Sequence, residues 1–253
     1  MPSITCYADP KKAYSLQVCR AFAAGCGGEV VTDFVAREGI AIIHGMADRQ
    51  VQLMREVEDW YEIDHAYFGR MMFHRVTHQG MWSDGTGRAD YERLKRFGIT
   101  VRTRKPVSRG DLILAIQSTG AYTAFGMTQD EWLSDTRREL RRYSNRACLI
   151  RHKPIGTNRM LPPLVNVLTS AWAVAVHSSG SAFEALALGL PVVVTEPRYP
   201  AARLATDPKD IETPRYPSHE ERLDLFARLA SQQWNLDEME SGDCWSELQN
   251  GHG

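Results

Sequence analysis

The sequence lacks the marks of membrane, secreted and disulfide-stabilised proteins. Its apolar runs are all shorter than the roughly 18–20 residues that a membrane-spanning helix needs. The first residues, MPSITCYADPKKAY, contain no basic stretch followed by an apolar one, so we expect no signal peptide. The five cysteines are scattered and form no CxxC pair, which argues against a disulfide framework or a zinc site. We therefore expect a cytoplasmic protein without a membrane partner.

An excess of one charge is missing from the whole chain but not from its parts. The formal net charge is −1. Residues 70–109 contain ten Lys or Arg and three Asp or Glu, whereas residues 207–253 contain four and eleven. The basic segment could bind a polyanion. Alternatively, the two segments face solvent or each other, as charged segments commonly do, so charge alone does not identify a partner.

Strand-like and helix-like segments alternate along the chain. In the first half we expect strands at 3–7, 29–34, 40–44 and 60–63, and helices at about 10–24 and 47–60. In the second half we expect strands at 112–119, 147–154, 171–176 and 191–197, with helices at 130–144 and 181–189. Nearly continuous apolar strands that alternate with helices are typical of parallel sheets covered on both faces. The predicted fold class is therefore α/β.

The middle of the chain separates two such halves. Residues 71–90 are rich in Gly, His and aromatic residues and have no clear period, so we expect loop there rather than a regular element. Residues 219–234 and 236–250 are expected to form one or two closing helices. We accordingly predict an N-terminal α/β domain at 1–105, a C-terminal α/β domain at 106–235, and a closing helix or tail at 236–253.

Polar residues end three of the expected strands in the second half. These strand ends read Gln117-Ser118-Thr119-Gly120, Arg151-His152-Lys153 and His177-Ser178-Ser179-Gly180-Ser181. Ligands of open α/β sheets bind beyond the carboxyl ends of the strands, so we expect the three to converge on one site. Hydroxyls and free N–H groups at the start of a helix favour a phosphate. Each residue alone has an ordinary alternative as a helix cap or a surface charge; the set together indicates a ligand.

The segment HSSGSAFEALALGLPVVV resembles the donor-binding segment of glycosyltransferases with the GT-B fold. The resemblance implies two Rossmann-like halves whose parallel sheets face each other across a cleft. It implies a nucleotide-sugar donor, best guessed as a UDP-sugar such as UDP-glucose, with no tightly bound cofactor, no metal site and Mg²⁺ as an optional helper. Glu184, one turn into the helix, would bind the ribose. The other implied donor contacts are Ser118, Thr119, Arg151, Lys153, His177, Ser178, Ser179, Gly180 and Ser181.

Sugar transfer needs a base beside the acceptor hydroxyl. We expect the N-terminal half to supply it, with Asp64, placed just after a strand, as the first candidate. His65 is the second, and His44 and Asp84 are further alternatives. Segment 61–82 interleaves Arg, His and aromatic residues, as in grooves that track phosphates and stack bases. The acceptor contacts expected from it are Arg70, Arg75 and Trp82.

Compact GT-B proteins of this kind are similar to bacteriophage DNA glycosyltransferases. That resemblance implies a hexosyltransferase that is a monomer, lies in the host cytoplasm if encoded by a phage, and acts on hydroxymethylcytosine or another hydroxymethylpyrimidine in double-stranded DNA. The rival acceptor is a saccharide, as in capsule or envelope polysaccharide synthesis, whose enzymes carry similar His-Ser-Ser segments. A nucleotide-sugar epimerase or hydrolase with the same fold, and a non-catalytic nucleotide-binding module, remain further alternatives.

Overall fold

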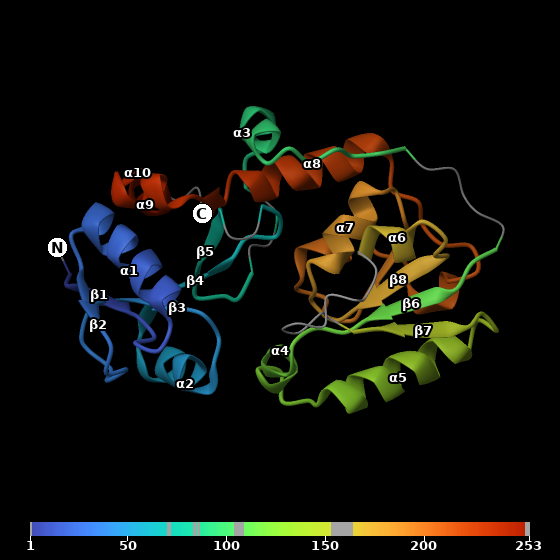
Figure 1. The fold of residues 1–253 in the computed structure, drawn as a ribbon, viewed down its shortest axis with the longest axis horizontal. Helices are drawn as coiled ribbons and strands as arrows, with labels where there is room; N and C mark the ends of the chain where they lie inside the picture. The colour runs from blue at the N-terminus through green and yellow to red at the C-terminus, as the bar shows by residue number, and fades with distance from the viewer. Residues whose placement is uncertain are drawn as a thin grey trace. The chain divides into compact units, whose positions relative to one another are not determined.

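The computed structural model describes residues 2–69, 72–82, 85, 87–103, 109–152 and 164–250. The chain forms two compact units, labelled by element in Figure 1. The first contains Met1–Phe97 together with Ala227–Gly253, and the second contains Gly98–Phe226. The chain therefore returns to its first unit at the end, through helix α8 (His219–Ala230). The domains expected at 1–105 and 106–235 had placed residues 227–235 in the second half.

The first unit is built on a six-stranded sheet. Its order is β10-β5-β4-β3-β1-β2, in which β1 to β4 are parallel, while β5 is antiparallel to β4 and β10 is antiparallel to β5. The strands are β1 (Ile4–Tyr7), β2 (Glu29–Val31), β3 (Ile40–His44), β4 (Asp59–His65), β5 (His74–His78) and β10 (Gln233–Trp234). The helices are α1 (Ala13–Cys26), α2 (Asp48–Glu56), α3 (Tyr91–Arg96), α9 (Leu236–Glu240) and α10 (Asp243–Gln249).

The two faces of this sheet are covered by different helices, because side chains alternate along each strand. Cys6 and Ile42 pack with Phe22 of α1 and with residues of α9 and α10. Tyr7 and Ile43, their neighbours in sequence, pack on the other face with α2. Figure 1 shows α1 and α2 on opposite sides of the sheet.

Helix α1 begins and ends two to three residues later than the expected 10–24. It begins at Ala13, since the carboxylate of Asp9 accepts the Lys11 N–H in a turn before the helix. It ends at Gly27, whose φ of 72° lies in the left-handed region that favours glycine. Gly25 allows a close approach to the α9–α10 connection, because a Cβ there would lie 1.9 Å from the carbonyl oxygen of Met239. The C-terminal helices therefore pack tightly against α1.

The second unit contains a parallel four-stranded sheet of order β7-β6-β8-β9. Its central strands β6 and β8 are buried at every residue, as their continuous apolar runs predict. The strands are β6 (Leu112–Ala115), β7 (Cys148–Arg151), β8 (Ala173–Val176) and β9 (Val192–Val194). The helices are α4 (Thr119–Thr123), α5 (Gln129–Arg141), α6 (Leu164–Leu168), α7 (Ser181–Ala187) and the larger part of α8, with 3₁₀ turns at Pro200–Leu204 and Pro208–Asp210.

Helix α5 covers one face of the second sheet and α7 the other (Figure 1). Trp132 and Leu140 of α5 pack on Leu114 and its neighbours. The helix begins at a capping box, in which Thr128 accepts the Glu131 N–H and Glu131 accepts the Thr128 N–H. The α/β class with parallel sheets is thus confirmed.

Three expectations for the secondary structure are wrong. The helix expected at 47–60 stops at Glu56, and β4 already begins at Asp59. Residues 71–90 were expected to be loop, yet β5 lies there. Gln233 and Trp234, expected in a helix, form a strand beside β5. In each case long-range strand pairing decides a conformation that local sequence does not indicate.

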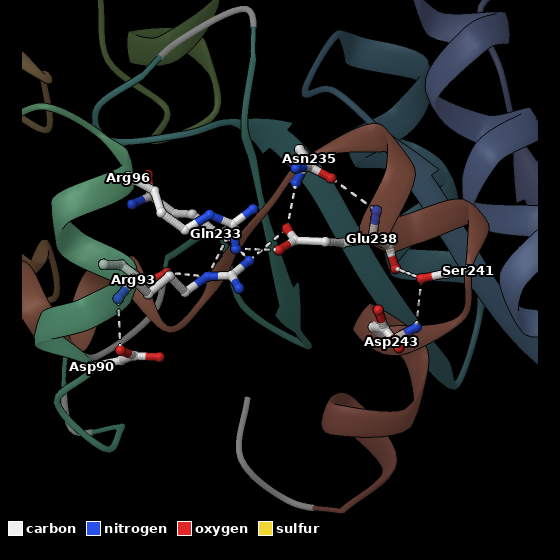
Figure 2. A network of polar contacts seen from close by, with 9 residues as sticks. Asp90, Arg93, Arg96, Gln233, Asn235, Glu238, Ser241 and Asp243 are labelled. Carbon is white, nitrogen blue, oxygen red and sulfur yellow. Dashed lines mark hydrogen bonds and ion pairs between the residues drawn. The ribbon is translucent and has the colours of Figure 1, made fainter.

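The C-terminal segment is tied to the first unit by a polar network around Glu238. Figure 2 shows the Glu238 carboxylate between the guanidinium groups of Arg93 and Arg96 on α3, at 2.6 and 2.7 Å, and the Asn235 N–H at 3.0 Å. Arg93 also donates to the carbonyl oxygens of Ala230 and Gln233.

In the part of the chain that is described, no helix has the length and apolar character to cross a membrane.

Candidate functional site

The carboxyl edge of the first sheet gathers polar side chains from several elements. Asp9 follows β1, His44 ends β3, and Asp64 and His65 end β4. Because β5 is antiparallel to β4, its first residues reach the same edge. The residues collected there are Asp9, Tyr14, Ser15, His44, Glu62, Asp64, His65, His74 and Arg75. We call this set the first-unit edge.

Asp64 and Arg75 form the centre of the first-unit edge. They are direct partners in the β4–β5 register, and the Asp64 Oδ2 lies 2.9 Å from the Arg75 Nη2. Glu62, two residues earlier on β4, points to the same face, and its Oε2 lies 3.4 Å from that Nη2. Arg75 further donates to the carbonyl oxygens of His65 and Met81. One guanidinium group therefore serves two carboxyl groups.

The two carboxyl groups differ in exposure. The Asp64 side chain keeps 30% of its surface exposed, and its Oδ1 accepts the His65 N–H at 2.7 Å. Burial opposes ionisation of Asp64, but the Arg75 charge and the His65 N–H outweigh it, so the pKa of Asp64 is lowered. Glu62 has 0% exposure, and burial raises its pKa to about 8 despite Arg75. At neutral pH the arrangement favours an ionised Asp64 beside a protonated Glu62.

Tyr14 lies among three histidine rings. Its hydroxyl is 2.6 Å from the His74 Nε2, and its ring stacks on His65 and His74 and meets His44 edge-on. Burial lowers the pKa of both His44 and His74 to about 4. Both rings are therefore neutral at physiological pH.

Ser15 links the histidine cluster to the end of β1. Its Oγ accepts the Asp9 N–H at 2.9 Å and lies 2.9 Å from the His44 Nδ1. The Asp9 carboxylate in turn pairs with Arg49. Ser15 of α1 thus joins the end of β1 to the end of β3 by hydrogen bonds.

The carboxyl edge of the second sheet is also polar. His177, directly after β8, is 3% exposed, and its Nδ1 lies 3.0 Å from the Thr195 Oγ1. The Thr195 Oγ1 accepts the Trp132 indole N–H at 2.8 Å. The His177 Nε2 is buried and has no hydrogen-bond partner among the residues described. Burial lowers the pKa of His177, so the ring is neutral at pH 7.

Two strand ends of the second sheet are in direct contact. The Gln117 Nε2 after β6 donates to the Ser178 Oγ after β8 at 3.1 Å. Arg151 is the last residue of β7 and pairs in register with Ala115 of β6. Ser118 and Thr119 stand at the start of α4. The neighbouring order of β7, β6 and β8 therefore places the three polar strand ends along one edge.

The serine turn before α7 has a local structure. The Ser179 Oγ accepts the Ser181 N–H at 3.3 Å and lies 3.2 Å from the Ser181 Oγ. Gly180 has φ −53°, a conformation open to any residue. Glu184 lies in the first turn of α7, as expected. Lys153, Arg70 and Asp84 lie outside the described residues.

Two solved structures share this fold. A β-Kdo 2,7 transferase of KpsC from Thermosulfurimonas dismutans matches with a TM-score of 0.54 and 14% identity, over 97% of this chain and 99% of that one. The β-Kdo 2,4 transferase of the same KpsC matches with a TM-score of 0.52 and 14% identity, over 88% and 89%. No protein-family model and no curated protein sequence matches the chain. The structural likeness shows that the chain shares the α/β fold of these two transferases.

The position of Arg75 differs from the sequence-based expectation. Arg75 was predicted to contact the acceptor, but it is only 6% exposed and binds Asp64, Glu62 and two carbonyl oxygens. Its charge is therefore engaged in organising the first-unit edge. Asp64 also lies within β4 rather than after it.

Sequence reasoning missed several members of both edges. Glu62, Tyr14 and His74 were not selected in the first unit, nor Thr195 and Trp132 in the second. The alternation of Glu62 and Asp64 along a strand could have indicated a shared face. His74 and Thr195 had no such signal, because their roles come from strands paired over long sequence separations. Among the described residues, no three His, Cys, Asp or Glu side chains are grouped so as to hold a metal ion.

Proposed function

We propose that the chain is a glycosyltransferase that moves a sugar from a nucleotide-activated donor to a saccharide hydroxyl group. The observation that carries the proposal is Asp64: an ionised, part-exposed carboxylate held at the carboxyl edge of a parallel sheet, in a chain that shares a glycosyltransferase fold over nearly its whole length. Parallel α/β sheets bind ligands beyond this edge.

The proposed chemistry gives each unit one role. In the first unit, Asp64 accepts the proton of the acceptor hydroxyl as its oxygen forms a bond to the anomeric carbon. The bond from that carbon to the donor phosphate breaks, and the nucleotide leaves with its negative charge. In the second unit, Arg151 and the groups around His177 and Ser178 bind that nucleotide. Glu184 would accept hydrogen bonds from the ribose.

The contacts of the basic segment, residues 70–109, bear on the class of acceptor. Four of the ten basic residues of this segment, Arg75, Arg93, Lys95 and Arg96, form ion pairs inside the first unit, so part of its charge is already engaged. The aromatic residues are engaged as well, since Phe97 packs on Phe68 and Phe73. A saccharide acceptor, as in capsule or envelope polysaccharide synthesis, therefore fits better than DNA.

The test is a transfer assay with the purified full-length chain. Nucleotide-activated Kdo, the sugar of the structural neighbours, and UDP-hexoses are each offered with Kdo-terminated oligosaccharides, other oligosaccharides, or hydroxymethylcytosine DNA. Mass spectrometry reads the added sugar. We expect a saccharide product, and we expect Asp64→Asn to lower kcat by about 10²–10⁴-fold, the usual contribution of a general base. Asp59→Asn, on the same strand but outside the edge, serves as the matched control.

The alternatives give different outcomes in the same assay. Sugar found on DNA would support the hydroxymethylpyrimidine acceptor in place of the saccharide. Donor consumed without any acceptor would indicate an epimerase or hydrolase. An Asp64→Asn variant as active as the Asp59→Asn control would remove Asp64 from the mechanism.

A further inference from the structure

Glu62 shares the Arg75 guanidinium group with Asp64. It is completely buried, and its Oε1 has no hydrogen-bond partner among the described residues. Its Oε2 lies 3.4 Å from the Arg75 Nη2, whereas the Asp64 Oδ2 lies 2.9 Å from the same nitrogen. Burying an ionised carboxylate whose oxygen has no hydrogen-bond partner costs free energy. Burying the protonated, neutral carboxyl group in the same place costs far less.

The strand register fixes this competition. Asp64 is directly opposite Arg75, and Glu62 is opposite Thr77, so the guanidinium reaches Glu62 only diagonally. Arg75 carries one positive charge, and two ionised carboxylates on this face would leave an uncompensated negative charge. The ionisable groups that act on Glu62 are Arg75 and Asp64. The part-exposed Asp64 carboxyl group therefore ionises, and the buried Glu62 carboxyl group keeps its proton.

We propose that Glu62 is a positioning residue for Asp64: it stays protonated at neutral pH and so leaves the Arg75 guanidinium to Asp64. The inference rests on the proposed function only in naming Asp64 as the base. If Glu62 loses its proton, the Arg75 guanidinium is drawn toward the buried Glu62 carboxylate and away from Asp64. The base then loses the contact that holds it in place.

Glu62→Gln separates this role from a simple structural one. Glutamine has the shape of a protonated glutamate and cannot ionise. Glu58→Gln, an exposed position just before β4, is the matched control. If Glu62 were instead an ionised partner of Arg75, the glutamine variant would lose stability and activity at every pH.

Two measurements test the proposal on the full chain. Infrared spectroscopy at pH 7 should show the C=O stretch of a protonated carboxyl group that is absent from Glu62→Gln and present in Glu58→Gln. That band should disappear as pH rises, with a midpoint near 8. In the transfer assay, kcat of the wild type should fall through the same pH range. For Glu62→Gln, kcat should show no such fall across this pH range.

The outcomes are distinct. No band at pH 7, or a band unchanged in Glu62→Gln, would overturn the proposal, as would a glutamine variant with the wild-type pH profile. The infrared result needs no substrate. A chain that shows the band but transfers no sugar would contradict the proposed function while leaving the proton on Glu62 established.

Discussion

Asp64 and Arg75 face one another across β4 and β5, with 2.9 Å between the carboxylate Oδ2 and the guanidinium Nη2. The pairing brings together side chains eleven residues apart in sequence and places them at the carboxyl edge of the first sheet. Arg75 thus belongs to the candidate site through its contact with Asp64. It also stabilises the surrounding backbone, because its guanidinium donates to two carbonyl oxygens.

Replacing Arg75 by Met should destabilise the protein strongly. The change leaves Asp64 and Glu62 without their cation and two part-buried carbonyl oxygens without this donor, so we expect the free energy of unfolding to fall by about 3–5 kcal/mol. Urea denaturation at pH 7 measures it. Arg55→Met, on the exposed side of α2, is the control and should change stability by less than about 0.5 kcal/mol. Equal effects of the two variants would show that Arg75 is not the organising cation.

The free energy of unfolding should fall in acid because His44 and His74 become protonated. The pKa of His44 and of His74 is about 4 in the folded chain, below the ordinary value of 6.5. The unfolded chain therefore binds more protons between these values. The resulting stability is complete above pH 6.5 and is lost as pH falls toward 4, by roughly 2 kcal/mol for each histidine.

His74→Asn tests this dependence. The variant should show a shallower loss of unfolding free energy between pH 7 and pH 4.5 than the wild type, whatever its stability at pH 7. The exposed His219→Asn is the control and should keep the wild-type slope. Parallel curves for wild type and His74→Asn would contradict a depressed pKa at His74.

The Thr195 hydroxyl should contribute more to the free energy of unfolding than the exposure of this residue suggests. It accepts the indole N–H of the buried Trp132 and contacts the Nδ1 of the buried His177. Thr195→Val keeps the shape and removes both hydrogen bonds, so we expect a loss of about 1–2 kcal/mol in unfolding free energy. Thr195→Ser keeps the hydroxyl and should lose less. Nitrogen-15 NMR of His177 should report a change of tautomer in the valine variant alone; identical spectra for both variants would exclude this role of Thr195.

Within the first unit, Glu238 should connect α9 to α3. Glu238→Gln removes the charge that Arg93 and Arg96 share (Figure 2), and we expect it to lower the free energy of unfolding by about 2–3 kcal/mol. Hydrogen exchange should become faster in both α3 and α9. The exposed Glu240→Gln is the control. Faster exchange confined to α9 would show that the ion pairs do not link the two helices.

The sequence predicted the parts of the fold that depend on local patterns. Continuous apolar runs indicated β6 and β8, and both are buried throughout. The glycines after residue 24 indicated the end of α1. The polar ends of the second-unit strands could also be predicted, because in a parallel sheet every strand ends at the same edge.

What the sequence could not predict depends on pairing between distant segments. His74 and Arg75 lie in a stretch without a clear period, and only the antiparallel pairing of β5 with β4 brings them to Asp64. The strand Gln233–Trp234 joins the first sheet more than 150 residues after β5, and no local propensity indicates that.

The sequence by itself determined the α/β class, the alternation of strands and helices, and the chemical types of side chain at the strand ends. Only the tertiary structure decided which of those side chains share a charge and which keeps a proton. The reason is physical: hydrophobic period and turn residues act over a few positions, whereas burial and the distance between Glu62, Asp64 and Arg75 arise only once β4 and β5 are paired.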